Sequence, residues 1–404
     1  MSGMAAKRLL VVTSRFPFGS QEAYLTAELR ELVRHVGEIA IVPIRPPAGP
    51  RKHAVPDGVE VLAWPLVGAD LLRRARAAAV AKPREVFGAI AAVLGSKDPG
   101  RLKNAALVVK GLALAQWAME RGVDHIHSYW ISAPATVAFI ASRASGIPWS
   151  STAHRWDIYE RNAFDVKQSS ASFVRTISNR GKIDLGERMP ALADRIVHLG
   201  LGTAVPPAPE RPRADVPGFR IVCPAALVKV KGHADLLAAV AQLRAWSVPV
   251  HCTFAGVGPL RAELQSQTTA LGLDGLVEFA GFVAQDELHE RYRTGRYAAV
   301  VLASRADGEN AMEGVPSALI EAMAFGVPVV ASDSGSICEL IDDRSGRLVK
   351  PGDARALARA LLDVHLNPDK AEARAERAYQ TIAERHDVRV QMREFAVLCG
   401  KRSL

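Results

Sequence analysis

The sequence predicts an α/β protein with two doubly wound, Rossmann-like parallel-sheet domains that face each other across a cleft. Two segments open alike, KRLLVVTS from Lys7 and FRIVCPAA from Phe219, because each is a short aliphatic run that ends in a loop. After each, apolar runs alternate with helical segments, which is typical of parallel sheets covered by helices. Between them, VPPAPERPRADVPG holds five prolines and few large apolar residues.

These observations predict the domain limits. We expect a first domain over residues 1–205, a proline-rich linker over 206–218 and a second domain over 219–382. A C-terminal helix over 383–404 would then be free to pack back on the first domain. The length of 404 residues is ample for two hydrophobic cores.

The first domain shows a helical period over residues 22–36, ended by Gly37, and then a strand over 39–44. Further strands are predicted at 125–130 and 148–154, with an apolar helix over 133–145 between them. Residues 102–119 are predicted to form one core helix, since two lysines and an asparagine make them too polar for a membrane span.

In the second domain, strands are predicted at 252–258, 297–304 and 327–332, each followed by a helix. One of these helices is expected to begin with Pro316 in its first turn and to end after Phe325, because Gly326 and Pro328 follow. Residues 371–400 are helical in composition, and their packing is left open.

Composition narrows the class of protein. The 49% of hydrophobic residues is ordinary for a globular protein and excludes a disordered chain. Four scattered cysteines form no CxxC pair, so neither a disulfide framework nor a zinc site is indicated. The first strand turns polar at Thr13 without the features of a signal peptide. We therefore expect a cytoplasmic protein.

The net charge of +9 lies in the first half. Residues 1–210 carry 27 Lys plus Arg against 18 Asp plus Glu, whereas residues 211–404 carry 24 against 24. The basic and apolar stretch from Leu71 to Phe87 is suited to anionic lipid headgroups, and a solvated helix face is the alternative. No nucleic acid is expected as a partner.

Ligands of doubly wound sheets bind beyond the carboxyl ends of the strands, so the loops there hold the candidate residues. The stretch from Asp307 to Leu340 places Glu313 and Glu321 on either side of a helix start. Carboxylates accept hydrogen bonds from sugar hydroxyls, and the backbone at Gly314, Val315, Pro316 and Ser317 lies where a helix N-terminus favours a diphosphate. This arrangement suits a sugar nucleotide.

The surrounding pattern, EGxPxxxxEAMAxGxPVVAxxxG, resembles the nucleotide-sugar site of family-four glycosyltransferases of the GT-B fold. The segments HIHSYW and TAHRWDIYE, with the loop FPFG and a following Glu, are similar to the bacterial exopolysaccharide group of the colanic-acid type. The resemblance implies transfer of a hexosyl group from a UDP- or GDP-sugar to a glycan acceptor, lipid-linked and at the inner face of the membrane. It also implies retention of anomeric configuration. No metal or other cofactor is expected, because helix N-termini and Lys231 can stabilise the departing diphosphate.

The same resemblance assigns roles in the second domain. Glu321 would hold the ribose, Glu313 the transferred hexose and Lys231 the leaving diphosphate. The loop with Gly256 and Gly258 would lie against the base and phosphate. Ala226 stands where the family has an arginine on the diphosphate; Lys229 would supply the missing charge, unless it belongs to a plain surface loop.

In the first domain, the resemblance places His154 near the scissile bond, and Asp157 would orient the local loop or a hydroxyl. Taken alone, His154 also fits a buried core histidine. Arg15 and Gly19 precede a helix N-terminus and would face the donor or acceptor. Many relatives have a second glycine where this chain has Ser20, which makes a close backbone approach harder.

Three alternatives accompany these assignments. The first is a non-catalytic component that binds nucleotide-sugars or glycans, and Ala226 motivates it. The second is a nucleotide-sugar epimerase on the same fold, which is less favoured because an epimerase would need neither the basic face nor an acceptor groove. The third is a metal site. His125 and His127 point to one face of a strand, but no third metal ligand is signalled nearby, so a core role is favoured.

Overall fold

The computed structural model describes residues 6–19, 22–45, 49–98, 100–207, 218–308 and 312–401. These residues form two compact units, one over Met1–Gly202 and Val388–Leu404 and the other over Thr203–Asp387. The chain therefore passes from one unit to the other twice. Most of the predicted linker, residues 208–217, lies outside the described residues, as does Ser20.

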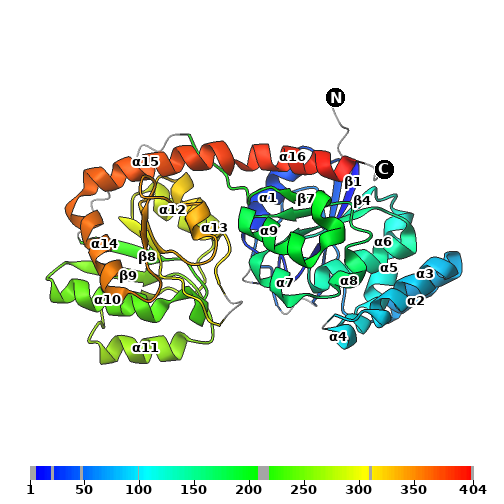
Figure 1. Ribbon diagram of the computed structural model, residues 1–404, viewed down its shortest axis with the longest axis horizontal. Coiled ribbons are helices and arrows are strands. Elements are labelled where there is room, and N and C mark those ends of the chain that lie inside the picture. The colour runs from blue at the N-terminus through cyan, green and yellow to red at the C-terminus, as the bar shows by residue number, and fades with distance from the viewer. Residues whose placement is uncertain are drawn as a thin grey trace. The chain divides into compact units, whose positions relative to one another are not determined.

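The first unit contains a seven-stranded parallel sheet in the order β3-β2-β1-β4-β5-β6-β7. Figure 1 shows it with helices on both faces. Its strands are β1 (Arg8–Thr13), β2 (Glu38–Pro43), β3 (Val59–Val61), β4 (His125–Ser128), β5 (Trp149–Ala153), β6 (Val174–Thr176) and β7 (Ile196–His198). Its α-helices are α1 (Tyr24–Leu32), α2 (Ala69–Ala81), α3 (Pro83–Gly95), α4 (Arg101–Ala105), α5 (Val108–Glu120), α6 (Ala133–Ser145), α7 (Arg155–Glu160), α8 (Phe164–Lys167), α9 (Asn179–Arg188) and α16 (Val388–Gly400).

The second unit contains a six-stranded parallel sheet in the order β10-β9-β8-β11-β12-β13. Its strands are β8 (Phe219–Cys223), β9 (Val250–Phe254), β10 (Val277–Phe279), β11 (Ala299–Leu302), β12 (Val329–Ser332) and β13 (Arg347–Val349). Its helices are α10 (His233–Ala245), α11 (Arg261–Ala270), α12 (Gln285–Arg293), α13 (Ser317–Ala324), α14 (Ala354–Leu366) and α15 (Pro368–Arg385), with short 3₁₀ turns η2 (Lys229–Lys231) and η3 (Ile337–Glu339). A further 3₁₀ turn, η1 (Pro190–Arg195), belongs to the first unit.

The strand orders confirm the predicted fold class of two Rossmann-like sheets. The first sheet reverses its direction of winding between β1 and β4, and the second between β8 and β11. At such a switch point the loops after the two strands diverge and leave room for a ligand. The strands β1, β4, β8 and β11 are almost entirely buried, which explains the aliphatic runs of β1 and β11. In contrast, β4 buries two histidines and β8 contains Arg220.

Two predicted boundaries were wrong, at Asn104 and at Pro316. Residues 102–119 form two helices, α4 and α5. The break follows Asn104, because its buried side chain donates a hydrogen bond to the side chain of Asn162 and its backbone carbonyl group closes a turn with the N–H of Leu107. Pro316 is the residue before α13 and has an extended conformation, so it does not lie in the first helical turn. Residues 371–400 are shared by α15 and α16, which are separated at His386 and Asp387.

The helix α16 belongs to the first unit, where it packs against α1 and β4. Phe395 is buried there, and its ring lies edge-on to the ring of His127, with 4.7 Å between centroids. None of the helices in the described residues is long and apolar enough to cross a membrane.

Candidate functional site

The sharpest feature of the second unit is a contact between Lys231 and Glu313, at the switch point of its sheet. Lys231 ends the turn that follows β8, and Glu313 lies in the loop between β11 and α13. The Nζ atom of Lys231 lies 2.6 Å from Oε2 of Glu313, and the hydroxyl of Ser304 donates to the same oxygen at 3.0 Å. Two of the residues predicted to bind the donor are therefore brought together.

The two residues of this pair are buried to different degrees, and the lysine remains accessible to solvent. Glu313 is 7% exposed, whereas the Lys231 side chain keeps 22% of its surface in solvent. An ammonium group has three donors. Within the described residues Glu313 takes one of those donors, so two are left for a second anion.

Close backbone packing holds the loops around this pair. Gly335 has φ +66°, and a Cβ atom there would lie 1.8 Å from the carbonyl oxygen of Glu313, so only glycine fits. The loops after β8 and β9 meet in the same way, since Cβ atoms at Gly256 and Gly258 would lie 1.9 and 2.4 Å from the carbonyl oxygens of Ala225 and Leu227. The two glycines thus have a packing role, and their predicted contact with the nucleotide stays a prediction.

Glu321 lies one turn into α13 and is 6% exposed. Its Oε1 accepts a hydrogen bond from Nε2 of Gln285 at 3.0 Å, and its Oε2 lies 3.1 Å from Nε2 of His289. Gln285 and His289 occupy positions i and i+4 of α12, which puts them on one face of that helix. Sequence reasoning missed both residues, although this spacing opposite a candidate carboxylate is a usable signal.

The N-terminus of α13 offers backbone donors. Pro316 is its N-cap, and the N–H groups of Gly314, Val315, Ser317 and Ala318 have no hydrogen-bond partner among the residues that the structure describes. Free N–H groups at a helix N-terminus carry partial positive charge and bind anions such as phosphate. Glu313 and Glu321 flank this end of the helix.

Lys229 does not share the position of Lys231. The two lysines lie two residues apart in a 3₁₀ turn, where successive side chains project about 120° apart, so they point in different directions. Lys229 is exposed and Lys231 is half-buried. Ala226, at the position where the resemblance implies an arginine, is half-buried in the loop that packs on Gly256.

In the first unit, Glu22 holds together the loop after β1. Its carboxylate accepts hydrogen bonds from the backbone N–H groups of Ser14, Arg15 and Phe16, at 3.1, 2.9 and 2.8 Å. It also accepts one from Nε1 of Trp130, at 2.7 Å. Trp130 follows β4, so Glu22 ties together the two loops at the switch point of this sheet. The sequence shows Glu22 only as part of a motif and gives no role to Trp130.

Two further predicted residues lie in the loop that Glu22 holds. The side chain of Arg15 is exposed, and the N–H of Gly19 donates to the carbonyl oxygen of Arg15 at 3.1 Å. A Cβ atom at Gly19 would lie 2.8 Å from Cβ of Arg15, so glycine permits this tight turn. Arg15 is thereby presented to solvent on a fixed backbone.

His154 follows β5 and is 6% exposed. Its ring lies on that of Trp130, with 4.3 Å between centroids, and its Nε2 is 3.1 Å from the hydroxyl of Tyr24. Burial, helped by the charge of Arg175, lowers the pKa of His154 to about 3, so the ring is neutral at neutral pH. Its Nδ1 is buried and has no hydrogen-bond partner among the described residues.

Asp157 fixes the backbone around His154. Its Oδ1 accepts from the N–H of His154 at 2.7 Å, and its Oδ2 accepts from the N–H of Ile131 at 2.6 Å. Burial raises the pKa of Asp157 to about 8, against the opposing effect of these two bonds. Asp157 is 2% exposed and bonds to backbone N–H groups of two different loops, which favours the loop-orienting role over a contact with a sugar hydroxyl.

His125 and His127 are core residues. The Nε2 of His125 and Nδ1 of His127 lie 2.7 and 2.8 Å from the hydroxyl of Ser150, and Nε2 of His127 lies 2.9 Å from that of Thr152. Burial lowers the pKa of both rings. Within the described residues, no group of three or more His, Cys, Asp or Glu is arranged to hold a metal ion.

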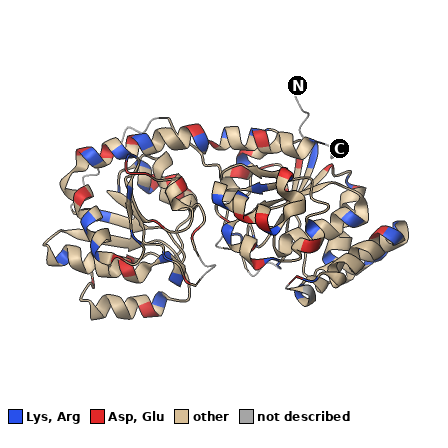
Figure 2. Cartoon of the chain, viewed as in Figure 1, with Lys and Arg blue, Asp and Glu red and all other residues tan. Residues whose placement is uncertain are grey.

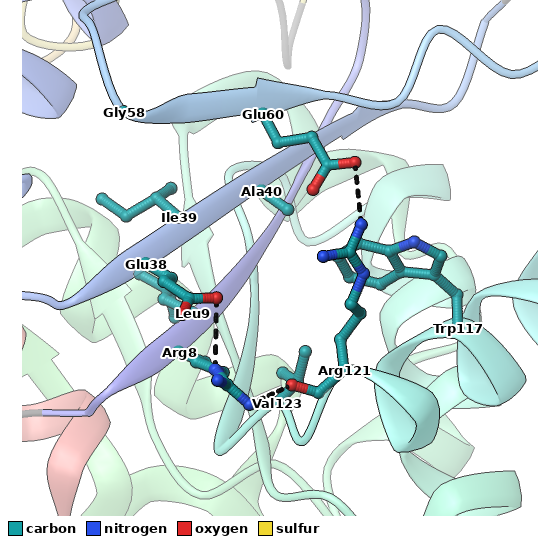
Figure 3. A pocket seen from close by; sticks show the side chains of 10 residues that line it. All are labelled: Arg8, Leu9, Glu38, Ile39, Ala40, Gly58, Glu60, Trp117, Arg121 and Val123. Carbon is teal, nitrogen blue, oxygen red and sulfur yellow. Dashed lines mark hydrogen bonds and ion pairs between the residues drawn. The ribbon is translucent and has the colours of Figure 1, made fainter.

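A small pocket of about 100 Å³ lies elsewhere in the first unit (Figure 3). It opens at the amino ends of β1, β2 and β3, the opposite edge of the sheet from His154. Its charges are already paired, Arg8 with Glu38 and Arg121 with Glu60, at 3.2 and 3.6 Å. The loops at the carboxyl ends are the better candidate site, because they hold Lys231, Glu313 and the N–H groups at the start of α13.

Comparison with known proteins agrees with this assignment. Residues 209–381 match the model of the family "Glycosyl transferases group 1". The matched segment contains Lys231, Glu313 and Glu321, which confirms the resemblance seen in the sequence.

Two curated relatives carry names from exopolysaccharide synthesis. The chain is 32% identical over 193 residues to the putative colanic acid biosynthesis glycosyltransferase WcaL of Escherichia coli strain K12, and the alignment covers 47% of each chain. It is 37% identical over 145 residues to the amylovoran biosynthesis glycosyltransferase AmsK of Erwinia amylovora, over 36% of this chain and 35% of the relative. The alignments thus span half or less of the length of these relatives.

A solved structure matches almost the entire chain. It is Anabaena Alr3699/HepE in complex with UDP and glucose, which superposes with a TM-score of 0.69 at 21% identity and covers 97% of this chain and 98% of the other. At this identity the likeness establishes the fold.

Proposed function

We propose that the protein is a retaining glycosyltransferase of exopolysaccharide synthesis. It transfers a hexosyl group from a UDP- or GDP-sugar to a glycan acceptor that is lipid-linked and presented at the inner face of the plasma membrane. The observation that carries the proposal is the convergence of Lys231, Glu313 and the free N–H groups of α13 at the switch point of the second sheet. That convergence lies in the segment that matches the glycosyltransferase family.

The chemistry follows from the residues. The bond between the anomeric carbon and the diphosphate oxygen breaks, an acceptor hydroxyl oxygen bonds to that carbon, and the hydroxyl proton leaves. Negative charge grows on the diphosphate, where the Lys231 ammonium group and the N–H groups of α13 stabilise it. We propose that these groups serve in place of a metal ion. Glu313 binds hydroxyls of the transferred hexose, and Glu321 binds the ribose.

His154 has a different role in the proposal. Its buried ring is neutral, and the unpartnered Nδ1 is a hydrogen-bonding atom for a sugar hydroxyl near the reacting carbon. Trp130 and Tyr24 hold the ring in place. Arg15, exposed on its fixed loop, is assigned to the acceptor or donor phosphate.

A panel of UDP-, GDP- and ADP-sugars tests the donor assignment. One nucleotide series should raise the melting temperature of the protein, because a ligand that binds only the folded state stabilises it. The active donor should then support transfer to a membrane fraction that contains lipid-linked glycans. If none of the nucleotide-sugars shifts the melting temperature, the proposal fails.

Ala226 favours a second candidate, a component that binds nucleotide-sugars or glycans without efficient transfer. It removes a cation from the diphosphate site, and exposed Lys229 does not occupy the same place. Saturable binding of one nucleotide-sugar with no turnover on any acceptor would favour this candidate over the enzyme.

A further inference from the structure

The outer helices of the first unit expose apolar residues beside cations. Of the twelve large hydrophobic residues that the described part of the chain exposes, half come from one stretch of the sequence between positions 67 and 102. They are Val67, Leu72, Val80, Phe87, Leu94 and Leu102. Such clustering on the outermost layer of a protein marks an interaction surface, whereas scattered single residues do not.

The helices α2 and α3 form a third layer. They pack against α5 and α6, respectively, and α6 in turn packs on β1, β4 and β5 (Figure 1). Their inner faces already satisfy the fold. An apolar residue on the outer face of either helix therefore does not contribute to the hydrophobic core.

The two faces of α2 are well separated. Leu71, Ala75 and Ala78 are buried on the inner face. At 100° per residue, Arg76 and Val80 project on the opposite side, and both are exposed, Val80 by 83%. An apolar residue and a cation thus share the outer face of this helix.

The next helix, α3, continues the pattern. Val86, Ala89 and Val93 are buried. Phe87 and Leu94, one position beyond Val86 and Val93, recur at i and i+7 on the outer side and are 73% and 46% exposed. Arg84 is exposed on the same helix.

Charge identifies the partner. Residues 69–95, which form α2 and α3, carry five Lys and Arg against two Asp and Glu, and Figure 2 shows the two helices as mostly uncharged, with basic and fewer acidic residues among them. Asp70 is neutralised by Arg73 and Arg74. Among the described residues, Arg76 and Arg84 make no ion pair. Apolar side chains flanked by unpaired cations match an anionic bilayer, where the first enter the interface and the second meet phosphate groups.

We propose that the outer face of α2 and α3 docks on an anionic lipid bilayer. The docking deepens the proposed function by naming the surface that brings the enzyme to a lipid-linked acceptor, although lipid binding itself requires no donor. Its test therefore separates it from the glycosyl transfer.

The experiment is co-sedimentation of the full chain with phosphatidylcholine vesicles, with and without phosphatidylglycerol. The parent protein should pellet with the anionic vesicles, and high salt should weaken the binding. The double variant Phe87→Ser/Leu94→Ser should lower the partition coefficient by about tenfold or more. Arg76→Gln/Arg84→Gln should lower the partition coefficient by about 25-fold, because each cation near an anionic surface contributes a factor of about five.

Matched controls lie on α14, in the second unit. Leu366→Ser removes an apolar residue that is 65% exposed, and Arg355→Gln/Arg359→Gln removes two exposed cations. These controls should sediment like the parent. All variants should keep the parent's melting temperature, because every substituted side chain is exposed.

Three results would overturn the proposal. The parent protein could fail to bind anionic vesicles, it could bind neutral vesicles equally well, or the α14 controls could lose as much binding as the α2–α3 variants. Self-association that Phe87→Ser/Leu94→Ser abolishes, without vesicle binding, would assign the face to a second copy of the chain. If vesicles bind and no nucleotide-sugar does, the docking stands and the proposed enzyme function falls.

Discussion

The Nζ atom of Lys231 lies 2.6 Å from Oε2 of Glu313, although 82 residues separate the two in the chain. The pair joins the residue assigned to the diphosphate to the residue assigned to the hexose. Because the lysine is fixed by the carboxylate, its remaining donors point in defined directions. The sequence predicts a role for each residue but contains nothing that indicates their contact.

Lys231→Ala should weaken donor binding by about 1.5–3 kcal/mol, the range for hydrogen bonds to charged groups. Titration calorimetry with the nucleotide-sugar that stabilises the protein measures this loss. Lys229→Ala is the matched control, since it removes the same charge two residues away from an exposed position. It should cost clearly less. Equal losses in both variants would mean that Lys231 acts only through its general charge.

Glu321→Ala should weaken nucleotide binding, because the carboxylate that binds the ribose is lost. The variant should fold but melt at a lower temperature, since Gln285 and His289 lose their shared acceptor, at a cost of about 1–3 kcal/mol. Gln285→Ala tests the positioning separately, because it leaves the carboxylate in place. It should lose less affinity than Glu321→Ala, and an unchanged affinity in Glu321→Ala would refute the ribose assignment.

His154→Ala should lower the rate of transfer by more than it lowers donor affinity, as expected for a contact near the reacting carbon. The pKa of about 3 predicts that His154 itself adds no inflection to the rate between pH 5 and 8. Tyr24→Phe, which removes one hydrogen bond but keeps the ring, is the milder comparison. If His154→Ala reduces affinity and turnover by the same factor, the residue only binds.

Stability should fall as pH drops below about 6.5. Buried His125, His127 and His154 have lowered pKa values, so the unfolded chain binds protons between pH 6.5 and about 3 while the folded chain does not. Asp157, with its raised pKa, acts in the opposite sense below pH 8. Urea unfolding at pH 7.0 and 5.5 measures the change. Between these two pH values, His125→Gln should lose about 1 kcal/mol less of the free energy of unfolding than the parent protein does. An equal loss in the variant and the parent would contradict the proposed role of the buried histidines.

Ala226→Arg should increase donor affinity by about 1–2 kcal/mol if the position still faces the diphosphate. The loop that carries Ala226 packs on Gly256, so its backbone is held in place. Ala226→Gln adds length without charge and should give little of the gain. A loss of affinity in both variants would show that this loop has no room for a longer side chain.

The sequence predicted the sheets well and the contacts within the site poorly. Strands such as β1 and β11 are buried almost throughout, so their aliphatic runs are unambiguous. Helix boundaries at Asn104 and Pro316 were misplaced because a side-chain bond in one case and an extended N-cap in the other override the local pattern.

Candidate residues from motifs, such as Glu313 and Lys231, lie at the predicted edge of the second sheet. Their partners were not foreseen. Gln285, His289, Trp130 and Tyr24 act through contacts with residues far away in the sequence, and local patterns such as the i, i+4 spacing of Gln285 and His289 do not say which residue each one contacts. Spacing along a chain locates a loop, whereas the hydrogen bonds of its side chains depend on which other loops the topology places beside it.

The return of α16 to the first unit has a consequence for the order of events during synthesis. The residues of this unit are interrupted by the complete second unit, and Phe395 covers His127 only after the last helix has emerged from the ribosome. Until then, the surface of α1 and β4 on which α16 packs stays uncovered in the growing chain. The second unit, contiguous in the chain, is free to complete its own packing first. The part of the protein that is translated earliest is thus the part that matures last.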